Sequence, residues 1–456
     1  MNIFLHTDVY KMGHMEQYCP GTTKVYSYLT ARNSKCFDSC VWFGIRYYIK
    51  NYLSNTVLKN SSLEEFFSTR EEILGCVTPV DVVKKMRALK ELGYWPISIK
   101  ILPEGPSYGF GIPLMTITNT HPDFYWCVGF LESLLLKVWY PCCVATHSRQ
   151  YLTVISDAAK DAMDIDEINS LPYLVHDFGY RGDASEESAM LSGGAHLLNS
   201  KGSDTVVAYK FMKETYPNYF MGMNSVPASE HSVMCSFGRE NEIDAYHHML
   251  NAYPTGIVSI VSDTYSIWNV LDNFVTQPEL RDKILSRNGK VVFRPDSGDP
   301  IKIICGDDEA PVGTPENLGC LRLLEKHFGT TINCYGYKLL NPKVGLIYGD
   351  GMYLERYKAT LNKMIEIGFS PSNLVIGVGG ILRNHTRDDL GMAIKATYVE
   401  VNGVGRNIMK DPITDHSKKS LSGRLQVING KVKENCSFKE EEEGDLKIIF
   451  KDGIVY

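Results

Sequence analysis

The sequence predicts an α/β protein whose central part is built from parallel βα units. Five short apolar runs end in polar and glycine residues, and stretches of helical periodicity separate several of them. Strands buried on both faces read as continuous apolar runs, so this alternation favours a parallel sheet. A (βα) barrel and an open doubly wound sheet both fit, because each gathers functional residues at the carboxyl ends of its strands. The runs are YLVHDFGYRGD (173–183), GIVSIVSDTYS (256–266), KVVFRPDSGDP (290–300), GLIYGDG (345–351) and LVIGVGG (374–380).

The segments on either side of this region mix strands with helices. KVYSYL (24–29) alternates like a strand, and SLEEFFSTREEILGCV (62–77) has helical spacing behind an N-capping serine. Near the C-terminus, QVINGKVKE (426–434) and IIFKDGIVY (448–456) predict two hairpins, because Asn-Gly and Asp-Gly favour tight turns between strands. The acidic run from Glu440 to Glu443 between these hairpins predicts a solvated loop.

The composition is that of a soluble globular protein. The 456 residues suggest two or three domains, and 47 Lys and Arg against 53 Asp and Glu give a net charge of −6, so we expect no nucleic-acid partner. The start, MNIFLHTDVYKMGH, lacks the layout of a signal peptide. The most apolar stretch, Tyr125 to His147, carries Glu132 and Lys137 and is interrupted at Pro141, which predicts a buried helix and no membrane partner. Twelve scattered cysteines without a CxxC pair favour a reducing, cytoplasmic compartment over a zinc site or disulfides.

Charged residues and glycines follow the predicted strands and point to phosphate chemistry. Arginine forks suit phosphate oxygens, and glycine-rich turns let backbone N–H groups approach an anion. Carboxylates bind Mg²⁺ through water or accept hydrogen bonds from ribose hydroxyls. Together these groups predict a pocket for a phosphorylated sugar and a metal-bound polyphosphate. The candidates are Asp177, Arg181, Asp204, Glu230, His231, Asp263, Arg294, Asp296, Asp350 and the glycines of GDG and GVGG.

Each candidate has a commoner structural explanation when it stands alone. A single aspartate after a strand is more often a helix cap than a catalyst, and an isolated GDG is more often a turn. His231 beside Glu230 would ordinarily be a structural histidine, and Arg181 and Arg294 would ordinarily form structural ion pairs. Established nucleotide motifs do not match, because GVGG is not GxGxxG, no GxxxxGK[ST] occurs, and DFG lacks the other kinase motifs. The recurrence of charge and glycine at five strand ends favours the phosphate-handling site.

The sequence resembles the nicotinamide phosphoribosyltransferase family, type II phosphoribosyltransferases of NAD salvage. The resemblance runs from TDVYKMGHMEQY near the start to FKDG at the end. It implies a barrel-like domain over residues 166–385 and an α+β domain formed by residues 1–165 and 386–456. It also implies a homodimer with active sites at the subunit interface. The motifs that carry it, in the family's order, are HDFGYRG, KGSDTV, SVPASEHS, SDTYSIWN, RPDSGDP, GYKLLNP, GDG and GRL.

The resemblance implies a pentosyltransferase that joins nicotinamide to 5-phosphoribosyl 1-diphosphate, giving nicotinamide mononucleotide and diphosphate. Phe178 would stack on one face of the nicotinamide ring, and Tyr10, supplied by the partner subunit, would cover the other. Two aromatic faces hold a neutral pyridine well. Asp204 would accept a hydrogen bond from the carboxamide NH₂, and Arg294 would donate to the carboxamide oxygen or the ribose. Asp296 would bind the ribose hydroxyls.

The resemblance further implies Mg²⁺ as cofactor, held mainly by the diphosphate, and ATP as co-substrate. ATP would phosphorylate His231, which Glu230 and Asp263 would orient, and this phosphohistidine would couple ATP hydrolysis to synthesis. The sugar and its phosphate would be lined by Gly349, Asp350, Gly351, Gly379 and Gly380. The cations around the phosphate groups would be Arg181, Arg387, Lys395, Lys410 and, from the partner subunit, Arg32.

The chain departs from the family pattern in places that bear on ATP or diphosphate affinity. Asp183 stands where the family usually has an apolar or small residue, and Tyr353 follows GDGM where a second aspartate is common. The glycine turn GVGGIL is about one residue shorter than usual, and the loop after Arg32 is abbreviated. None of these departures removes a residue assigned above.

Three other functions compete with this assignment. A nicotinate phosphoribosyltransferase would share the fold, but Asp204 would repel the carboxylate of nicotinate in a dry pocket. A non-catalytic binding or signalling homologue would be expected to have lost part of the set that includes His231, Asp296 and Asp350. A phosphotransferase working through a phosphohistidine would not need the aromatic pair Tyr10 and Phe178.

Overall fold

The computed structural model describes residues 1–414 and 418–456 and divides the chain into two compact units. Unit 1 comprises Met1–Thr146 and His385–Tyr456, and unit 2 comprises His147–Asn384. Helix α8 (Trp139–Ala159) begins in unit 1 and continues into unit 2, whereas the predicted boundary at residue 165 lies beyond this helix. The domain boundaries from the sequence stay a prediction.

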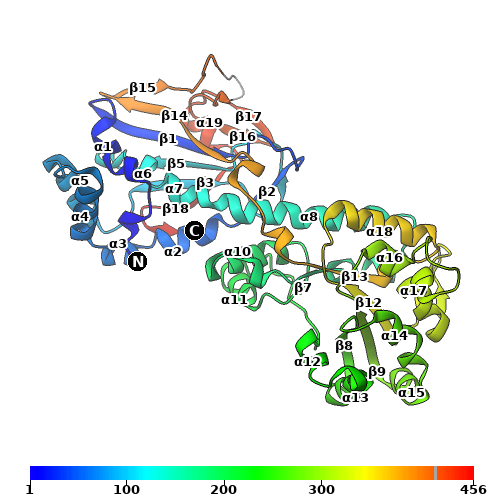
Figure 1. Cartoon of the computed structure of the whole chain (residues 1–456). Coiled ribbons are helices and arrows are strands. Elements are labelled where there is room, and N and C mark those ends of the chain that lie inside the picture. The colour runs from blue at the N-terminus through cyan, green and yellow to red at the C-terminus, as the bar shows by residue number, and fades with distance from the viewer. Residues whose placement is uncertain (415–417) are drawn as a thin grey trace. The chain divides into compact units, whose positions relative to one another are not determined.

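Unit 1 contains a seven-stranded antiparallel sheet made from both ends of the chain. In Figure 1 the N-terminal β1, in blue, lies between β14, in orange, and β5, in cyan, and the pairing of β1 with both is antiparallel. This confirms the predicted α+β architecture of the terminal segments. In spatial order the strands are β15 (Val404–Asn407), β14 (Ala393–Val401), β1 (Thr22–Thr30), β5 (Met115–Asn119), β3 (Ile97–Ile101), β18 (Lys447–Lys451) and β19 (Ile454–Val455).

The helices of unit 1 follow local sequence signals. The predicted helix at 62–77 is α4 (Leu63–Leu74), and the Ser62 hydroxyl accepts a hydrogen bond from the Glu65 N–H as the expected N-cap. The apolar stretch breaks into short helices, with Pro141 in the first turn of α8, where its missing N–H costs little. The other elements are η1 (Ile3–Leu5), η2 (Val9–Gly13), α1 (His14–Gln17), β2 (Cys40–Val41), α2 (Ile45–Tyr52), α3 (Asn55–Asn60), α5 (Val80–Leu92), β4 (Ser107–Tyr108), η3 (Pro122–Phe124), α6 (Cys127–Phe130), α7 (Glu132–Leu135), η4 (Leu136–Val138) and η11 (Arg387–Asp389).

Within the described part of the chain, no single helix has the length and apolar character needed to cross a membrane. The bent pair at residues 122–130 and 132–159 reaches that threshold together, on length and composition alone.

Both C-terminal hairpins form as predicted, but the acidic run between them is a helix. The hairpins are β16 (Gln426–Ile428) with β17 (Lys431–Lys433) and β18 with β19, and both residues of each Asn-Gly or Asp-Gly turn have positive φ. The solvated-loop prediction was wrong, because residues 438–442 form α19 (Phe438–Glu442) behind a capping box on Ser437. Glu441 is only 4% exposed and lies 3.0 Å from both Lys100 Nζ and Arg424 Nη1. Two cations of unit 1, Lys100 and Arg424, therefore hold this acidic helix in place.

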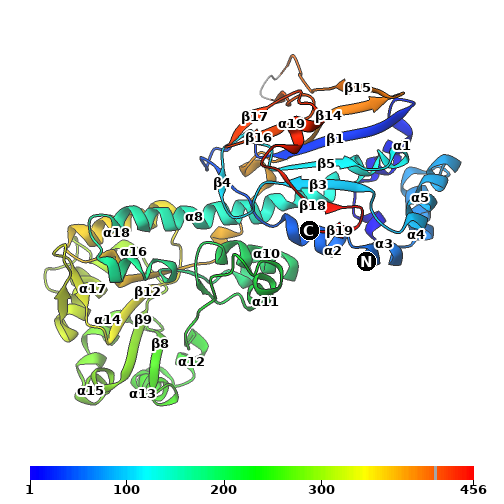
Figure 2. The same cartoon turned by 180° about the vertical axis from the view of Figure 1, so that it is seen from behind.

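Unit 2 is built on a six-stranded sheet in which all neighbouring strands run parallel. Each of the five predicted runs supplies one strand, which confirms the α/β class, and β12, β9 and β8 follow one another in both views (Figures 1 and 2). Only the two-residue β7 has no counterpart in the predicted set. In spatial order the strands are β7 (Gly202–Ser203), β6 (Val175–Asp177), β13 (Leu374–Val378), β12 (Val344–Tyr348), β9 (Asn288–Arg294) and β8 (Thr255–Val261).

An extended segment, residues 224–229, joins the two edges of this sheet. At one end the Asn224 N–H donates to the Lys201 carbonyl at 2.7 Å beside β7. At the other end the Ser259 N–H of β8 donates to the Pro227 carbonyl at 2.9 Å. The sheet is therefore a half-barrel with an irregular closing segment, which is the barrel-like alternative of the two that the sequence left open.

Helices pack against the half-barrel and complete its core. Strand residues such as Val258, Val291 and Ile376 are fully buried. The stretches of helical periodicity between the predicted strands include NEIDAYHHMLNAY and PENLGCLRLLEKHFG, which form α13 and α17. The elements are α9 (Ile165–Ile168), η5 (Leu171–Tyr173), η6 (Tyr180–Gly182), α10 (Glu186–Leu197), α11 (Val206–Thr215), α12 (His231–Cys235), η7 (Arg239–Asn241), α13 (Glu242–Ala252), α14 (Ile267–Asp272), η8 (Phe274–Thr276), α15 (Pro278–Ser286), α16 (Pro300–Cys305), α17 (Pro315–Phe328), β10 (Thr330–Ile332), β11 (Lys338–Leu340), α18 (Leu354–Glu366), η9 (Pro371–Asn373) and η10 (Gly380–Leu382).

Candidate active site

The candidate residues of unit 2 lie at the carboxyl ends of the parallel strands. Because neighbouring strands share one direction, the residues that follow them meet at one edge of the sheet. Phe178 follows β6, Asp263 follows β8, Asp296 follows β9, Asp350 follows β12, and the glycine turn at 379–380 follows β13. The fold therefore brings together residues that are up to about 200 positions apart in sequence.

The ring of Phe178 lies directly over the backbone of the neighbouring strand β13. A Cβ added at Gly377 would come within 2.3 Å of the Phe178 ring, so only glycine leaves room for the ring there. The Phe178 N–H donates to the Val378 carbonyl at 2.8 Å, which fixes the backbone on which the ring is mounted. One edge of the ring also approaches Gly349, whose added Cβ would be 3.5 Å from Cε2. A half-buried aromatic face is thus presented at the strand edge.

Asp263 links His231 to the loop that carries Asp296. The His231 Nε2 lies 3.1 Å from Asp263 Oδ1, while Asp263 Oδ2 accepts hydrogen bonds from the Asp296 N–H at 2.8 Å and the Ser297 hydroxyl at 2.6 Å. The Asp263 carboxylate is 5% exposed and the His231 side chain 49% exposed. A buried carboxylate therefore holds one nitrogen of an accessible imidazole. Ser297 lies inside the RPDSGDP motif but was not among the predicted site residues.

Glu230 makes a different contact from the one the sequence suggested. Its carboxylate accepts a hydrogen bond from the Ser232 hydroxyl, so its role in orienting His231 stays a prediction. A second carboxylate, Glu242 at the start of α13, was not predicted. Burial raises the pKa of Glu242 to about 7, with Arg239 lowering it and Asp263 raising it.

Carboxylates accumulate around Asp296. Burial raises the pKa of Asp296, and the charges of Asp263 and Asp350 raise it further, against the opposing effects of Arg294 and His231. Arg294 Nη2 is 3.9 Å from Asp296 Oδ2, and Arg294 Nε is buried with no hydrogen-bond partner in the described parts of the chain. This edge of the sheet would thus gain from a cationic or hydroxyl-rich ligand, and an oxygen acceptor would satisfy Arg294.

Asp204, which follows β7, stays ionised beside His176. Burial acts to raise the pKa of Asp204, but hydrogen bonds from His176 and Ser225 outweigh it and lower the pKa below its ordinary value. His176 Nε2 is 3.2 Å from Asp204 Oδ1, and the His176 ring centroid is 5.0 Å from that of Phe178. Neither His176 nor Ser225 was among the predicted site residues. The two-residue spacing of His176 and Phe178, which places both on one face of an extended segment, was a usable signal for His176.

The predicted phosphate-binding cations of unit 1 form a group of their own. Lys395 lies on β14 opposite Tyr28 of β1, and Arg32 is the second residue after the end of β1. Burial lowers the pKa of Lys395, and the charges of Lys410, Arg32 and Arg387 lower it further, although Glu132 opposes them. Because like charges are gathered here, an anion would relieve their repulsion.

The remaining candidates are found on exposed short helices. Tyr10 lies on η2 of unit 1, is 57% exposed, and has its ring 5.2 Å from that of His14. Arg181 is exposed on η6 of unit 2. The structure thus assembles the predicted residues in two groups. Unit 1 carries Tyr10, Arg32, Arg387, Lys395 and Lys410, and unit 2 carries Phe178, Arg181, Asp204, Glu230, His231, Asp263, Arg294, Asp296, Gly349, Asp350, Gly351, Gly379 and Gly380.

Tyr353, one of the departures from the family pattern, supports the GDG turn. The Arg356 guanidinium lies 4.6 Å from the centre of the Tyr353 ring, and Arg356 Nη1 donates to the Gly351 carbonyl at 3.0 Å. The tyrosine therefore stacks with the arginine that fixes the turn.

Comparison with known proteins first identifies the class of enzyme to which the chain belongs. The model of the Nicotinate phosphoribosyltransferase (NAPRTase) family matches residues 173–446. The fold is similar to the crystal structure of human Nicotinic Acid Phosphoribosyltransferase, with a TM-score of 0.60, 14% identity, and coverage of 98% of this chain and 90% of that chain. It is also similar to nicotinate-nucleotide pyrophosphorylase from Pyrococcus furiosus, with a TM-score of 0.57, 15% identity, and coverage of 99% and 91%. Fold and family model together define a phosphoribosyltransferase.

Comparison with relatives of higher sequence identity identifies the family within this class. Nicotinamide phosphoribosyltransferases of Acinetobacter baylyi, Xanthomonas campestris pv. campestris and Mycoplasma pneumoniae are 38%, 36% and 32% identical to the chain. The alignments cover 98%, 94% and 93% of this chain and 93%, 87% and 95% of the relatives. Residues 2–72 match the model of the Nicotinamide phosphoribosyltransferase N-terminal domain. The chain belongs to the nicotinamide phosphoribosyltransferase family, which confirms the resemblance found in the sequence.

Proposed function

We propose that the chain transfers the 5-phosphoribosyl group from 5-phosphoribosyl 1-diphosphate, the phosphoribosyl donor, to nicotinamide, forming nicotinamide mononucleotide and diphosphate for NAD salvage. Family membership supports the reaction, and one observation carries the choice of base. An ionised, half-exposed Asp204 carboxylate contacts His176, whose ring centroid lies 5.0 Å from that of Phe178. A carboxamide NH₂ would donate to this carboxylate, whereas the carboxylate of nicotinate would be repelled by it.

The chemistry requires positioning and charge stabilisation rather than a general base. The neutral pyridine nitrogen attacks the anomeric carbon while the bond to diphosphate breaks, so the ribosyl group becomes positively charged and the leaving group negatively charged. Asp296 and Asp350 would stabilise the first charge and bind ribose hydroxyls. Cationic side chains such as Arg181 and Lys395 would stabilise the negative charge of the departing diphosphate.

Mg²⁺ would be brought largely by the diphosphate. Within the described residues, no three His, Cys, Asp or Glu side chains are arranged to hold a metal ion. Asp296 and Asp350 would supply only part of the Mg²⁺ coordination. Mg²⁺ in proteins commonly binds one or two carboxylates together with the phosphates of the substrate. When bound, the ion would neutralise part of the diphosphate charge.

His231 would accept a phosphoryl group from ATP. Its Nε2 faces Asp263 Oδ1, so Nε2 would carry the proton and Nδ1 would keep the lone pair that attacks the γ-phosphorus. ADP leaves as the bond to its oxygen breaks, and water later hydrolyses the phosphohistidine. Asp263 would stabilise the positive charge that the ring acquires.

The active site would be completed by a second subunit. Tyr10 and Arg32 belong to unit 1, and the base-binding residues belong to unit 2. In a symmetric homodimer one isologous interface would supply Tyr10 and Arg32 to both sites at once.

One assay tests the proposal. Purified protein is given the labelled phosphoribosyl donor and Mg²⁺ with nicotinamide, nicotinate or quinolinate, with and without ATP. We expect labelled mononucleotide from nicotinamide and a higher yield with ATP. Product from nicotinate in preference to nicotinamide would replace the proposal with the nicotinate alternative, and the absence of product from every base would favour a non-catalytic homologue.

A further inference from the structure

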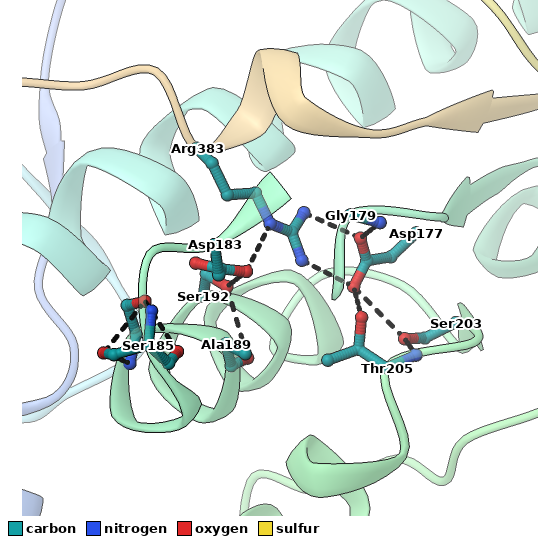
Figure 3. A network of polar contacts seen from close by, with 10 residues as sticks. Asp177, Gly179, Asp183, Ser185, Ala189, Ser192, Ser203, Thr205 and Arg383 are labelled. Carbon is teal, nitrogen blue, oxygen red and sulfur yellow. Dashed lines mark hydrogen bonds and ion pairs between the residues drawn. The ribbon is translucent and has the colours of Figure 1, made fainter. Parts of the chain in front are cut away.

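A buried arginine, Arg383, joins two aspartates, Asp177 and Asp183 (Figure 3). Its Nη1 lies 2.7 Å from Asp177 Oδ1, and its Nη2 donates to Asp177 Oδ2 at 2.9 Å. Its Nε donates to Asp183 Oδ2 at 3.0 Å. The side chains are 3%, 0% and 1% exposed for Arg383, Asp177 and Asp183. One cation thus lies between two carboxylates out of contact with solvent.

Asp177 connects this ion network to two of the residues proposed to contact nicotinamide, Phe178 and Asp204. Asp177 Oδ1 accepts from the Gly179 N–H at 2.8 Å, so the carboxylate spans Phe178 from one side of its backbone to the other. Asp177 Oδ2 accepts from the Thr205 hydroxyl at 2.7 Å and the Ser203 hydroxyl at 3.3 Å, the two neighbours of Asp204 in sequence. One carboxylate therefore sets the backbone positions of the aromatic ring and of Asp204 together.

Arg383 and Asp183 connect the same network to the glycine turn and to α10. Arg383 directly follows η10, which begins in the glycine turn. Asp183 accepts from the Ser192 hydroxyl of α10 at 2.8 Å. The backbone at Gly179 lies against the guanidinium, since an added Cβ there would be 2.2 Å from Arg383 Cζ. The loop that carries Phe178 is thus clamped between the arginine and α10.

The charges in this network are strongly coupled. Burial acts to raise the pKa of Asp177, but Arg383, together with His196 and the Thr205 hydroxyl, lowers it to about 2. Burial acts to lower the pKa of Arg383, and the two aspartates raise it above its ordinary value. A buried ion network is a weak source of stability compared with an apolar core of the same volume. We therefore expect this ion network to matter more for fixing the positions of the neighbouring backbone segments than for the stability of the fold.

We infer that Arg383, held by Asp177 and Asp183, is a positioning residue that sets the distance between Phe178 and Asp204 and thereby determines nicotinamide affinity and the preference for nicotinamide over nicotinate. This inference rests on the proposed function of the site. Asp183, which departs from the family pattern, acquires a role in it as the second anchor of the arginine. Lysine cannot replace Arg383, because only the planar fork reaches both carboxylates in fixed directions.

Three variants test the inference. Arg383→Lys keeps the charge and loses the fork, and Asp183→Asn keeps the shape and loses one charge. The matched control is Arg287→Lys, because Arg287 is also a buried arginine of unit 2 and donates to the carbonyls of Tyr253 and Thr255 at 3.1 and 2.9 Å, at the opposite, amino end of the sheet. For each protein we would measure Tm, kcat, the KM of each substrate and the kcat/KM ratio of nicotinamide to nicotinate.

Arg383→Lys is expected to raise the nicotinamide KM by about ten- to a hundredfold and to lower the base preference, since misplacements near 1 Å have effects of this size. The KM for the phosphoribosyl donor should change much less. Asp183→Asn should shift the same two quantities in the same direction by less, and Arg287→Lys should change Tm alone. Equal changes in both KM values, or an Arg383→Lys profile matching the control, would overturn the inference. If the wild-type protein makes no mononucleotide from nicotinamide, the proposed function itself has failed, which the parallel wild-type assay reveals separately.

Discussion

The candidate residues form two groups of opposite charge, one on each unit, which are the two halves of the site that we propose. In unit 2 the strand edge gathers carboxylates, and the pKa of Asp296 is raised by burial and by Asp263 and Asp350. In unit 1 the sheet gathers cations, and the pKa of Lys395 is lowered by burial and by its positive neighbours. Each half would be relieved by a ligand of the opposite charge. In the proposed reaction the substrate separates into a positive ribosyl group and a negative diphosphate, which would offer one charge to each half.

The halves also differ in how firmly they are held. Asp263 and Asp177 each make several short hydrogen bonds that tie neighbouring strand ends together. Among the cations of unit 1, Arg32 Nε donates to the Gly391 carbonyl at 2.7 Å, and Arg387 Nη2 lies 2.9 Å from Asp388. In unit 2 the carboxylates therefore join strand ends through side-chain networks, whereas the two arginines of unit 1 are held by a backbone carbonyl and by an adjacent aspartate. Variants in each half should therefore affect different substrates.

The largest effect is expected when one residue of each half is mutated in a separate chain. Each variant alone should lose activity, and exchange of subunits between the two variants should restore part of it. Tyr10→Ala and Asp296→Ala are each expected to be nearly inactive as pure homodimers, because every site then lacks either the tyrosine ring or the aspartate carboxylate. Random exchange makes about half of the dimers mixed, and half of the sites in each mixed dimer would be intact, so activity should rise towards about a quarter of the wild-type value. Rates are measured before and after exchange. A fully exchanged mixture that stays inactive would mean that both residues act in one site from one chain.

Removing the charge of Asp204 should alter base selection without affecting the phosphate half. Asp204→Asn loses a charged hydrogen bond of about 1.5–3 kcal/mol, so the preference for nicotinamide over nicotinate should fall by roughly ten- to a hundredfold. Competing substrates in one reaction measure this ratio. Asp282→Asn, an exposed aspartate on α15, serves as control. Unchanged relative kcat/KM values would remove Asp204 from this role.

Removing the charge of Lys395 should have the converse effect. Lys395→Met is expected to raise the KM for the phosphoribosyl donor by about tenfold, the size of one charge-assisted hydrogen bond, and to leave the nicotinamide KM unchanged. The control is Lys451→Met on β18 of the same sheet. Because the pKa of Lys395 is lowered, the wild-type KM for the anionic substrate should begin to rise at a lower pH than an ordinary lysine would allow, and Lys395→Arg should delay that rise. An equal rise in both KM values would contradict the division between the halves.

His231→Ala should remove the effect of ATP while sparing basal synthesis. Without the imidazole held by Asp263, no acid-labile phosphate should be incorporated from labelled ATP, and ATP should no longer change the rate. His248→Ala, an exposed histidine on α13, is the control. ATP stimulation that persists in His231→Ala would assign the phosphorylation to another residue.

The smallest effect concerns stability rather than activity. Burial lowers the pKa of His196 to about 4, against 6.5 for an ordinary histidine. Its Nδ1 faces the Ser148 hydroxyl and its Nε2 the Gly202 carbonyl. Because the unfolded chain binds the proton more tightly, the free energy of unfolding should fall as pH drops from about 6.5 to 4, by up to ~3 kcal/mol from this residue. Urea unfolding of wild type, His196→Asn and the control His248→Asn across that range measures the slope. A slope unchanged in His196→Asn would contradict the assignment.

The sequence alone determined much of the fold, because its signals are local. Apolar runs ending in polar clusters identified five of the six parallel strands, and Asn-Gly and Asp-Gly identified both C-terminal hairpins. The same runs placed Asp263, Asp296 and Asp350 at the edge of the sheet, since a parallel sheet brings its carboxyl ends together. Ordered motifs over the whole length indicated the family.

The tertiary structure alone decided the features that depend on pairing between distant segments. The two-residue β7 exists because β6 lies beside it, and Glu441 of α19 is buried because Lys100 and Arg424 neutralise its charge. Asp183 and Arg383 are 200 residues apart, so neither carries a sign of the other. A local pattern records what a segment prefers, whereas burial of a charge is stabilised only by a partner that folding brings to it.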